Sequence, residues 1–351
     1  MISYQIIEHG KPLQKKMLET PKPQGSEVLM RVTRSGVCHS DLHIWDGYFD
    51  LGGGKRFYVK ERGCVPPITL GHEPFGVVEA VGPKAPKSLI GKKRLIHPWI
   101  GCGKCAVCKA GQENYCVSGT RILGVNRAGG YSTHLLVPDA KYLIDASGID
   151  EAFAATLACS GVTAYSASAK LPALAPSDRV AIIGCGGVGM TAVALASAAT
   201  RARVVAIDPD PAKREAALAH GAALAFDPAA PEAAKTIGKA CGFDIAGAID
   251  FVGAESSSSL AVSLVRRTGQ VVIVGLFGGE FRMPLPMFAL KSLRITGSYV
   301  GSPADLRELV ALAQRVTLPQ IPLDLRPLAE VNQALGDLAA GRVVGRVVLQ
   351  P

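Results

Sequence analysis

Short apolar runs alternate with turn residues along the first 150 positions of the chain. Three of the runs are rich in β-branched residues and lie at 28–32, 75–81 and 94–97. Glycines and prolines separate them, so the pattern predicts many short strands joined by tight turns. Such a segment is typical of a barrel-like β domain.

From Ala152 the pattern changes to an alanine-rich helical one that runs to Ala169. Strand-like apolar runs then alternate with helical segments. The predicted strands lie at 180–184, 204–208, 222–226, 245–250, 271–275 and 293–298, with helices at 188–199 and 211–220 between them. Six strands that alternate with helices predict parallel pairing, and therefore a doubly wound α/β sheet.

Beyond about Tyr299 the alternation ends. Helices are predicted at 303–316 and 328–340, and a last strand at 343–349. This final segment is too short to fold as a domain of its own. We therefore expect it to return to the first domain and make that domain discontinuous.

Composition excludes several classes of protein. Of the 351 residues 48% are apolar and 19% are charged, as expected of a compact α/β protein. The net charge of +9 is not gathered into basic blocks, so nucleic acid is not an expected partner. The uncharged stretch 180–200 is long enough to span a bilayer, but its glycines favour a strand, a tight turn and a buried helix. The first ten residues lack the apolar core of a secretory signal, which predicts a cytoplasmic location.

A glycine-rich turn predicts a dinucleotide site. The segment 184–189 reads GCGGVG, follows a predicted strand and opens a predicted helix. Its glycines allow a tight turn, close approach of a pyrophosphate and close packing of helix on strand. The expected cofactor contacts here are Gly184, Gly186, Gly187, Val188 and Gly189.

The next predicted strand ends at Asp208, which indicates the type of dinucleotide. Its carboxylate would accept hydrogen bonds from the ribose hydroxyls and would repel a 2′-phosphate. We see no arginine placed to bind such a phosphate, so the sequence predicts NAD rather than NADP. Lys213 is placed to contact the same ribose.

Four of the nine cysteines lie close together and predict a structural metal site. Four thiolates at this spacing close a tetrahedral zinc site that has no open position and does no chemistry. A redox dithiol would need only two of them. The proposed ligands, in a lobe at 99–120, are Cys102, Cys105, Cys108 and Cys116. We treat Cys64, Cys185 and Cys241 as structural.

A second group is dispersed along the chain and comprises Cys38, His72 and Cys159. Two cysteines, one histidine and a water form a known open zinc site. Spacing alone does not bring these three residues together. A buried cysteine that acts as a small apolar residue and a hydrogen-bonded core histidine stay open as alternatives.

Taken together, these segments resemble the zinc-dependent medium-chain alcohol dehydrogenases, in overall pattern the bacterial and archaeal NAD-dependent members. The matching segments are GVCHSDLH at 36–43, GHE at 71–73, CGKCAVCKAGQENYC at 102–116, LACSG at 157–161, GCGGVG at 184–189 and GRVVGRVVL at 341–349. The resemblance implies a GroES-like catalytic domain at 1–159 and 300–351 and a Rossmann domain at 160–299. It also implies two zinc ions per chain and a homotetramer, with a dimer as the alternative.

The resemblance also implies the roles of individual residues. Cys38, His72 and Cys159 would hold the catalytic zinc, and Glu73 would either lie behind these ligands or act as a transient one. Asp41 would orient the zinc-bound imidazole. The alcohol proton would pass to Ser40 and then, through the nicotinamide ribose hydroxyl, to His43. The remaining implied cofactor contacts are His39, which replaces a pyrophosphate-binding arginine of some members, Thr163, Val274 and Arg346.

Three aromatic residues are candidates for an apolar substrate pocket, with core packing as the alternative for each: Trp45, Phe49 and Trp99. The segment between His43 and His72 is longer than in the shorter family members. Its extra part, 47–66, is interpreted as an exposed insertion, a lid or an oligomer contact.

Other functions stay open from the sequence. A polyol or sugar dehydrogenase of the same superfamily is the main alternative, although the resemblance suggests that many of those lack the four-cysteine lobe. An oxidase of formaldehyde–thiol adducts is a further one. An NAD(H)-binding protein without activity could share the fold, but it would not need the ligands and relay residues.

Overall fold

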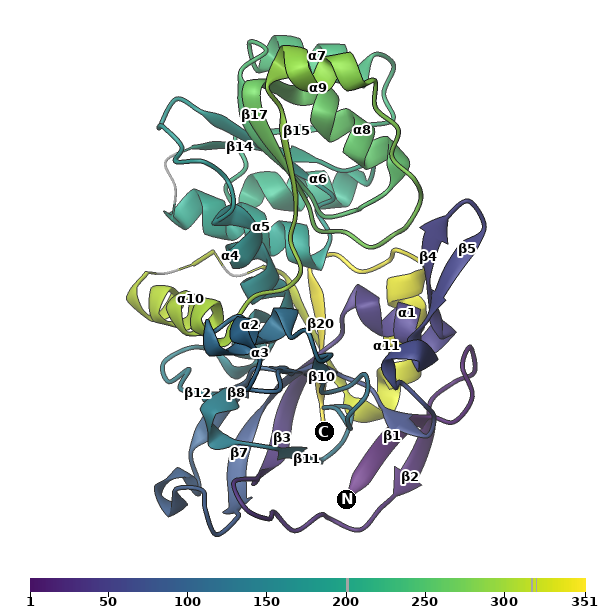
Figure 1. Ribbon diagram of the computed structural model, residues 1–351, viewed down its shortest axis with the longest axis vertical. Helices are drawn as coiled ribbons and strands as arrows, with labels where there is room; N and C mark the ends of the chain where they lie inside the picture. Colours follow the sequence, from purple (N-terminus) through teal and green to yellow (C-terminus); the bar gives the residue numbers. More distant parts are fainter. Residues whose placement is uncertain (200–201, 317, 320) are drawn as a thin grey trace.

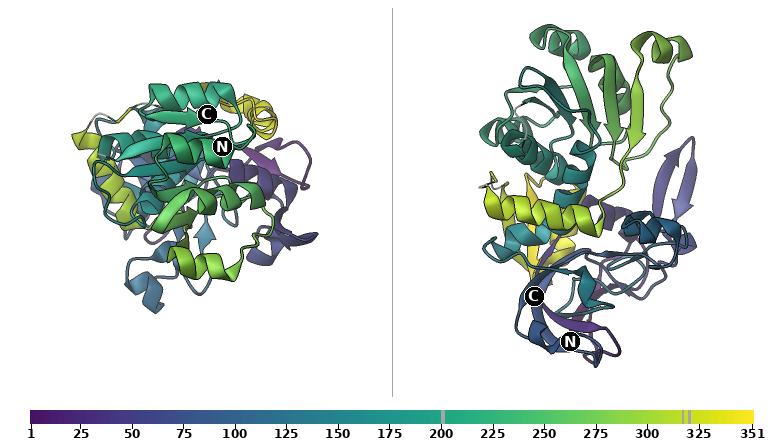
Figure 2. Two further views of the ribbon diagram at one scale, coloured as in Figure 1. Left: turned by 90° about the horizontal axis from the view of Figure 1, so that it is seen from above. Right: turned by 60° about the vertical axis from the view of Figure 1, so that its left-hand side comes forward.

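Two lobes are stacked along the long axis of the molecule in the computed structural model, which describes residues 1–199, 202–316, 318–319 and 321–351 (Figure 1). The lower lobe holds the N-terminal strands and the last strand of the chain, and the upper lobe holds the strands between residues 179 and 297 (Figures 1 and 2). The α-helices are α1 (His39–Asp46), α2 (Ala106–Lys109), α3 (Glu151–Thr156), α4 (Val162–Ser168), α5 (Gly187–Ala199), α6 (Pro211–Ala219), α7 (Ala233–Ala240), α8 (Glu255–Leu264), α9 (Leu285–Lys291), α10 (Pro303–Arg315) and α11 (Val331–Ala339). The shorter helical segments are η1 (Val59–Arg62), η2 (Lys87–Leu89), η3 (Glu113–Tyr115), η4 (Ala140–Tyr142), the π-helix η5 (Leu157–Gly161) and η6 (Leu328–Glu330).

The lower lobe is built on one large and several small sheets. The strands of the large sheet are β3 (Val28–Gly36), β7 (Glu73–Val81), β8 (Lys93–Ile96), β11 (His134–Val137), β12 (Leu143–Ile144), β19 (Leu323–Pro327) and β20 (Arg346–Gln350). They pair in the order β12-β8-β7-β3-β20-β19, with β11 also paired to β3. The small sheets contain β1 (Ile2–Ile6), β2 (Gln14–Met17) and β6 (Ile68–Thr69), then β9 (Trp99–Ile100) and β10 (Arg121–Ile122), then β4 (Tyr48–Gly52) and β5 (Lys55–Tyr58).

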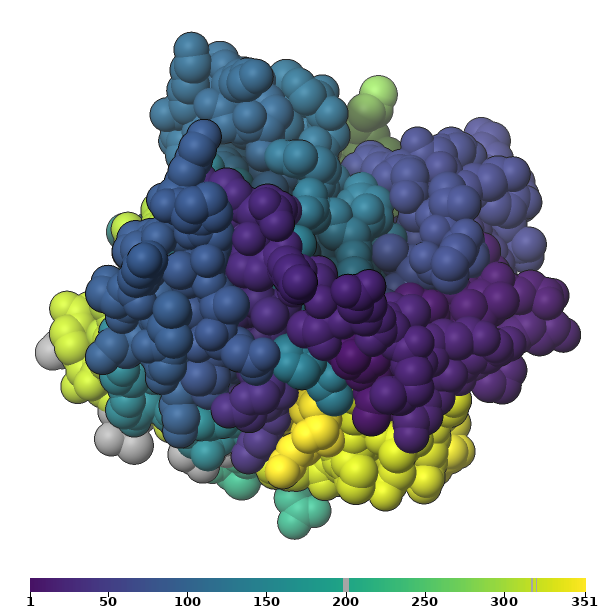
Figure 3. All heavy atoms as spheres, turned by 90° about the horizontal axis from the view of Figure 1, so that it is seen from below, coloured from purple at the N-terminus to yellow at the C-terminus, as the bar shows by residue number. Residues whose placement is uncertain are grey.

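The chain returns to the lower lobe at its end. Strand β20 pairs with β3 through Val348 opposite Gly36 and Leu349 opposite Ser35. Seen from below, the C-terminal segment (yellow) lies against the N-terminal part of the molecule (purple) (Figure 3). Strands from both ends of the sequence therefore share one sheet. This brings Arg346, the first residue of β20, into the sheet whose strand β3 leads directly to Cys38.

The upper lobe is a parallel sheet covered by helices on both faces. Its strands are β13 (Arg179–Ile183), β14 (Arg203–Ile207), β15 (Leu224–Phe226), β16 (Ile245–Asp250), β17 (Val265–Ile273) and β18 (Arg294–Gly297). Among the described residues they form one six-stranded sheet in the order β15-β14-β13-β16-β17-β18, and each pair of neighbouring strands is parallel. This confirms the predicted doubly wound fold. The strand order reverses at β13, where such sheets bind ligands beyond the carboxyl ends of the strands.

The apolar pattern of β13 explains why both faces of this sheet are covered. Val180 and Ile182 belong to the buried cluster under α5, whereas Ala181 and Ile183 belong to the cluster under α7 and α8. Successive side chains of a strand point to opposite faces, so a continuous apolar run requires cover on both sides. Within the described part of the chain, none of the helices is long and apolar enough to cross a membrane. Thr200, at the end of the uncharged stretch, lies outside the described residues.

One helical segment joins the lobes. It runs from α3 through η5 to α4, and α4 packs against α5 of the upper lobe and against α10. The turn at η5 is a π-helix and contains Cys159. Single-turn π-helices are rare and occur often at functional sites.

Candidate functional site

Three side chains that are remote in sequence meet between the lobes. Cys38 follows β3, His72 precedes β7, and Cys159 lies in η5. Together with Glu73 they form a buried group whose ligand atoms all lie within 4.8 Å of one another. The Sγ atoms of Cys38 and Cys159 are 3.8 Å apart, close to the separation of about 3.8 Å between two sulfurs that each bind a tetrahedral zinc at about 2.3 Å.

Asp41 fixes two of these residues. Cys38 is the residue before the first turn of α1, and its backbone N–H donates to Asp41 Oδ2 at 3.0 Å. The other carboxylate oxygen, Oδ1, lies 2.9 Å from Nδ1 of His72. The imidazole is therefore held through Nδ1, and Nε2, which lies 3.2 Å from Oγ of Ser40, is the nitrogen that could bind a metal ion. The geometry is the one expected for the orienting role of Asp41.

Ser40 lies in the first turn of α1, next to Cys38, and His43 lies in its last turn. The Oγ atom of Ser40 is 3.3 Å from Sγ of Cys38 and 3.2 Å from Nε2 of His72. The ring of His43 is 5.5 Å from that of His39, and burial lowers the pKa of both histidines. Because a lowered pKa keeps the imidazoles neutral near pH 7, His43 can accept a proton there.

A buried ion pair connects this group to the glycine turn. Arg346 pairs with the carboxylate of Glu73, and both residues are buried. Burial raises the pKa of Glu73 to about 7, and Arg346 opposes that effect. A Cβ atom on Gly187 would collide with the Arg346 side chain, so the guanidinium lies beside the first turn of α5.

The glycine turn has the geometry required for a dinucleotide. Gly184 has a φ of +84°, and a Cβ atom on Gly189 would collide with the carbonyl oxygen of Gly184. Around Gly186, by contrast, no atom lies within 4 Å of the Cβ position. Thr163 is buried, and its Oγ1 has no hydrogen-bond partner. Open space at a helix N-terminus and an unpartnered hydroxyl fit a cofactor with phosphate and amide groups.

Asp208 lies where its strand position predicts, at the end of β14. Its Oδ2 accepts the backbone N–H of Cys185 at 2.7 Å, and its Oδ1 accepts that of Asp210 at 2.9 Å. Lys213 lies 3.6 Å from the Asp210 carboxylate. Asp208 therefore joins the glycine turn to the start of α6.

The guanidinium of Arg214 lies close to Asp208. Arg214 donates to the carbonyl oxygens of Asp208 and Pro209 at 2.8 and 2.7 Å. It also lies 3.6 Å from the carboxylate of Asp227. These contacts occupy its guanidinium with acceptors of the protein itself.

Two further residues are expected to contact the cofactor. Val274 lies on the loop after β17, and His39 packs against that loop. His39 stacks on Phe277, with ring centroids 4.9 Å apart. Val274 is partly buried and donates its backbone N–H to the carbonyl oxygen of Asp250 at 2.9 Å. The loop that contains Val274 and Phe277 therefore packs against the first residue of α1, His39.

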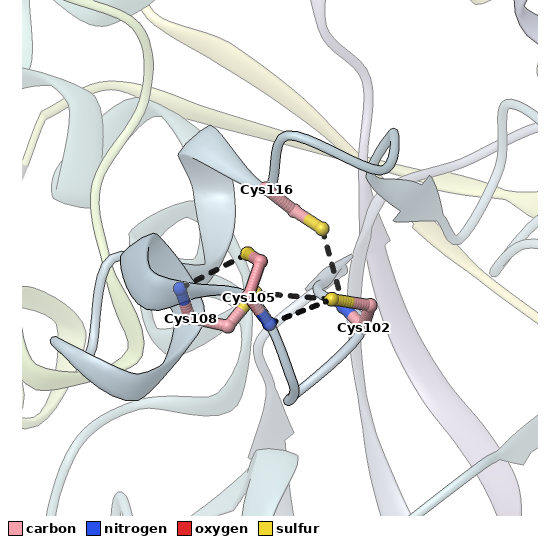
Figure 4. Close-up of side chains that lie close together, drawn as sticks. All are labelled: Cys102, Cys105, Cys108 and Cys116. Carbon is pink, nitrogen blue, oxygen red and sulfur yellow. Dashed lines mark hydrogen bonds between the residues drawn. The ribbon is translucent and has the colours of Figure 1, made fainter.

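The four clustered cysteines also meet. Their ligand atoms lie within 4.8 Å of one another (Figure 4). Backbone N–H groups of Lys104 and Cys105 each point at Sγ of Cys102 from 3.4 Å, and these donors lower the pKa of Cys102 to about 6. Donors aimed at sulfur stabilise the thiolate, which is the form that binds zinc.

The three aromatic candidates for the pocket separate in the structure. Phe49 lies with its ring 4.8 Å from that of His43, and Trp99 lies 6.0 Å from that of His72. Trp45 instead donates its indole N–H to the carbonyl oxygen of Lys11 and, like Phe49, packs on an apolar cluster that joins β1, α1, α11 and β20. The structure therefore does not bring Trp45 to the site.

The 47–66 segment forms the β4–β5 hairpin and η1, and it touches the upper lobe. A Cβ atom on Gly278 would lie 2.6 Å from the carbonyl oxygen of Asp50, and one on Gly52 would lie 2.7 Å from the backbone of Gly279. The hairpin thus packs backbone to backbone on the loop after β17. This contact favours the lid interpretation over a freely exposed insertion.

One residue of the site has no signal in the sequence. Tyr131 is fully buried, and its hydroxyl donates to Asp41 Oδ2 at 2.6 Å. It follows two glycines in a segment that reads only as a turn, and its partner is remote in the chain. Only the folded geometry reveals the contact.

Known proteins match this chain along its whole length. The family model for the alcohol dehydrogenase GroES-like domain matches residues 24–147, and that for zinc-binding dehydrogenases matches residues 187–315. The NAD-dependent alcohol dehydrogenase of Sulfurisphaera tokodaii is 34% identical over 353 residues, which is 100% of both chains. The crystal structure of the alcohol dehydrogenase from Aeropyrum pernix superposes with a TM-score of 0.90 at 31% identity, again over 100% of both chains.

A sugar-acid enzyme is also among the relatives. The L-galactonate-5-dehydrogenase of Escherichia coli is 31% identical over 309 residues, which covers 87% of this chain and 85% of that protein. The relatives of this chain therefore include an enzyme named for a polar substrate.

Proposed function

Since this chain belongs to the zinc-dependent medium-chain alcohol dehydrogenases, we propose that it transfers a hydride between NAD and an apolar primary or secondary alcohol. The reaction would be reversible and would give the aldehyde or ketone. The observation that carries the proposal is the meeting of Cys38, His72 and Cys159 within 4.8 Å of one another, below the glycine turn that fits a dinucleotide.

Zinc is proposed at both cysteine groups, with two ions per chain. Cys38, His72 and Cys159 would leave one position of a tetrahedral ion open for substrate, whereas the four clustered thiolates would leave none. When bound, the catalytic zinc would polarise the alcohol oxygen as a Lewis acid, and NAD would accept the hydride. The protein would contribute binding, orientation and proton transfer.

The side chains of α1 would handle the alcohol proton. Ser40 Oγ lies beside both Cys38 and His72, so it would accept the alcohol proton and give up its own hydroxyl proton to the nicotinamide ribose hydroxyl. His43, uncharged because burial lowers its pKa, would receive the proton passed on by the ribose hydroxyl and release it to solvent. Thr163 Oγ1, buried without a partner, would hydrogen-bond the nicotinamide amide.

Arg346 and Glu73 would link cofactor and metal. Arg346 lies between the Glu73 carboxylate and the turn at Gly187, so its positive charge is available to a pyrophosphate bound at the start of α5. A bound pyrophosphate would compete with Glu73 for the guanidinium. Glu73 would then be released to act as a transient ligand.

NAD should be preferred over NADP, because the Asp208 carboxylate, at the end of β14, would bind the ribose hydroxyls and repel a 2′-phosphate. Steady-state kinetics should give a kcat/KM for NAD at least about 100-fold above that for NADP, or about 2.7 kcal/mol. Asp208→Ala should narrow this ratio, since it removes the repulsion of the 2′-phosphate and leaves Arg214 nearby. An Asp210→Ala variant is the matched control and should keep the ratio. A wild-type preference for NADP would contradict the role given to Asp208.

The substrate is proposed to be apolar because the side chains that flank the relay and ligand residues are aromatic. Phe49 lies against His43 and Trp99 against His72, and neither offers a carboxylate or an amide to a polyol. The hairpin that carries Phe49 would close over the substrate as a lid. Trp45 is left out of the proposed pocket.

A substrate panel tests this function. NADH formation is measured with aliphatic, aromatic and cyclic alcohols and with sorbitol and threitol, with and without a chelator. We expect at least about tenfold higher kcat/KM for the best apolar alcohol than for either polyol, and loss of activity with the chelator. A polyol preference would replace the proposal by a polyol or sugar dehydrogenase. NADH binding without turnover on any alcohol or carbonyl compound would indicate a binding protein.

Assembly and location are further proposals. Helix α9 and the neighbouring segment expose apolar side chains, among them Leu285 and Leu290, which are 82% and 68% exposed. Helix α9 packs on β17 and precedes β18 in the chain, and β18 is the last strand of the parallel sheet among the described residues. Exposed apolar side chains and a strand at the edge of a sheet both fit a contact with a second copy of the chain. We propose a homotetramer, or at least a dimer, in the cytoplasm.

A further inference from the structure

We propose that Tyr131 is a positioning residue of the catalytic site: its hydroxyl fixes the Asp41 carboxylate, and through it both Cys38 and His72. This inference rests on the proposed zinc site and assigns a role to a residue that does not itself touch the metal ion. The evidence is the contacts of Asp41, the anchoring of Tyr131 and the burial of both.

The Asp41 carboxylate has three donors that come from three separate parts of the chain. Tyr131 Oη donates to Oδ2 at 2.6 Å, and the Cys38 backbone N–H donates to the same oxygen at 3.0 Å. Nδ1 of His72 lies 2.9 Å from Oδ1. Asp41 and Tyr131 are both 0% exposed. The tyrosine contact is the shortest of the three and has the length of a charge-assisted O–H···O⁻ hydrogen bond.

The position of the Tyr131 ring is itself fixed. The backbone N–H of Tyr131 donates to the carbonyl oxygen of Leu70 at 2.9 Å, and Tyr4 N–H donates to the carbonyl oxygen of Tyr131 at 2.9 Å. The ring packs on Gly71, where a Cβ atom would lie 2.5 Å from the ring carbon Cδ1. Tyr131 thus contacts the residue before His72 with its ring and the partner of His72 with its hydroxyl.

Loss of the hydroxyl would loosen the orientation of the ligands and would leave the fold in place. Asp41 would keep the Cys38 N–H and the His72 ring, but the carboxylate could rotate about its last torsion. Each rotation moves the acceptor that holds the imidazole. Hydrogen-bond partners of metal ligands typically change metal affinity by about 10- to 100-fold. Because Tyr131 acts on the ligands only through Asp41, we expect the metal affinity to change by about tenfold.

Tyr131→Phe removes the hydroxyl alone and is the test. The rate at which each zinc ion is lost to a chromophoric chelator is measured, together with the visible spectrum of the cobalt-substituted enzyme. We expect zinc loss from the catalytic site to be about tenfold faster and the cobalt bands to shift. Zinc loss from the four-cysteine site and the Kd for NADH should stay unchanged, and kcat should fall more than KM changes.

Tyr142→Phe is the matched control. Tyr142 is also buried and donates to a carboxylate, Glu113 Oε2, at the same 2.6 Å. It should change thermal stability and leave the catalytic zinc and the cobalt spectrum as in the wild type. If Tyr131→Phe behaves in the same way, the residue is merely structural and the proposal is wrong.

A double-mutant cycle with Asp41→Asn tests whether Tyr131 acts through Asp41. The effect of Tyr131→Phe on zinc release should disappear in the Asp41→Asn background, because the partner that it fixes is already changed. Additive effects would contradict the proposed route. Failure of the zinc site itself is recognised separately, since the wild type would then release only one class of zinc.

Discussion

Cys38→Ser should lower kcat/KM for alcohol oxidation by at least about 1000-fold while NADH still binds. A factor of 1000 corresponds to about 4 kcal/mol of transition-state stabilisation. The loss follows from the position of Cys38, which supplies one of three proposed ligands and whose Sγ lies 3.8 Å from that of Cys159. A serine hydroxyl is not deprotonated at neutral pH and does not replace a thiolate as a zinc ligand.

NADH binding separates this effect from misfolding. The glycine turn and Asp208 lie in the upper lobe, whereas Cys38 follows β3 of the lower lobe, so the Kd measured by NADH fluorescence should change by less than about threefold. Elemental analysis should find the zinc of the four-cysteine site retained. Wild-type turnover in this variant would show that the catalytic assignment is wrong.

Cys64→Ser is the matched control for this experiment. Cys64 is buried, like Cys38, and lies in the same lobe. It packs in the apolar cluster that joins β1, α1, α11 and β20. Its replacement places a hydroxyl in an apolar environment and should cost stability. Turnover of the folded protein and the zinc content should remain those of the wild type.

The upper lobe could be predicted from the sequence because its signals are local. Each strand carries its own apolar run, and the glycine spacing and Asp208 lie within two adjacent elements of a βαβ unit. The four-cysteine site is local too, since all its ligands lie within one short lobe. In both cases the geometry follows from residues that are close along the chain.

The catalytic cluster could not be derived in the same way. Cys38, His72 and Cys159 come from a strand end, a loop and a π-helix, and no local pattern encodes their meeting. The resemblance to a family, rather than periodicity, supplied that expectation. Tyr131 shows the limit of both routes, because neither its neighbours nor the matching motifs point to Asp41.

The expectation that Trp45 lines the substrate pocket could have been avoided by considering the helical period. His43 and Trp45 are two positions apart on α1, and side chains at that spacing do not share a face of a helix. The face that directs His43 toward the site therefore directs Trp45 toward the N-terminal strands, where its indole meets Lys11.

Cys102→Ser should remove one zinc ion per chain and lower the midpoint of thermal inactivation by at least about 5 °C. Freshly purified wild type should contain two zinc ions per chain, and the variant only the catalytic one. Cys102 is partly exposed and receives N–H groups from Lys104 and Cys105. Its replacement creates almost no cavity, so the loss of stability would come from the metal ion.

The location of the lobe explains why this loss would affect stability rather than chemistry. Glu113, within the lobe, accepts the Gly101 N–H, the Tyr142 hydroxyl and the Lys141 ammonium. These contacts tie the lobe to the large sheet, and without the metal ion they must hold a short loop that has little apolar core of its own. Cys241→Ser, in the apolar cluster under α7, should keep both zinc ions. Two zinc ions in Cys102→Ser, or one in fully active wild type, would contradict the assignment of this site.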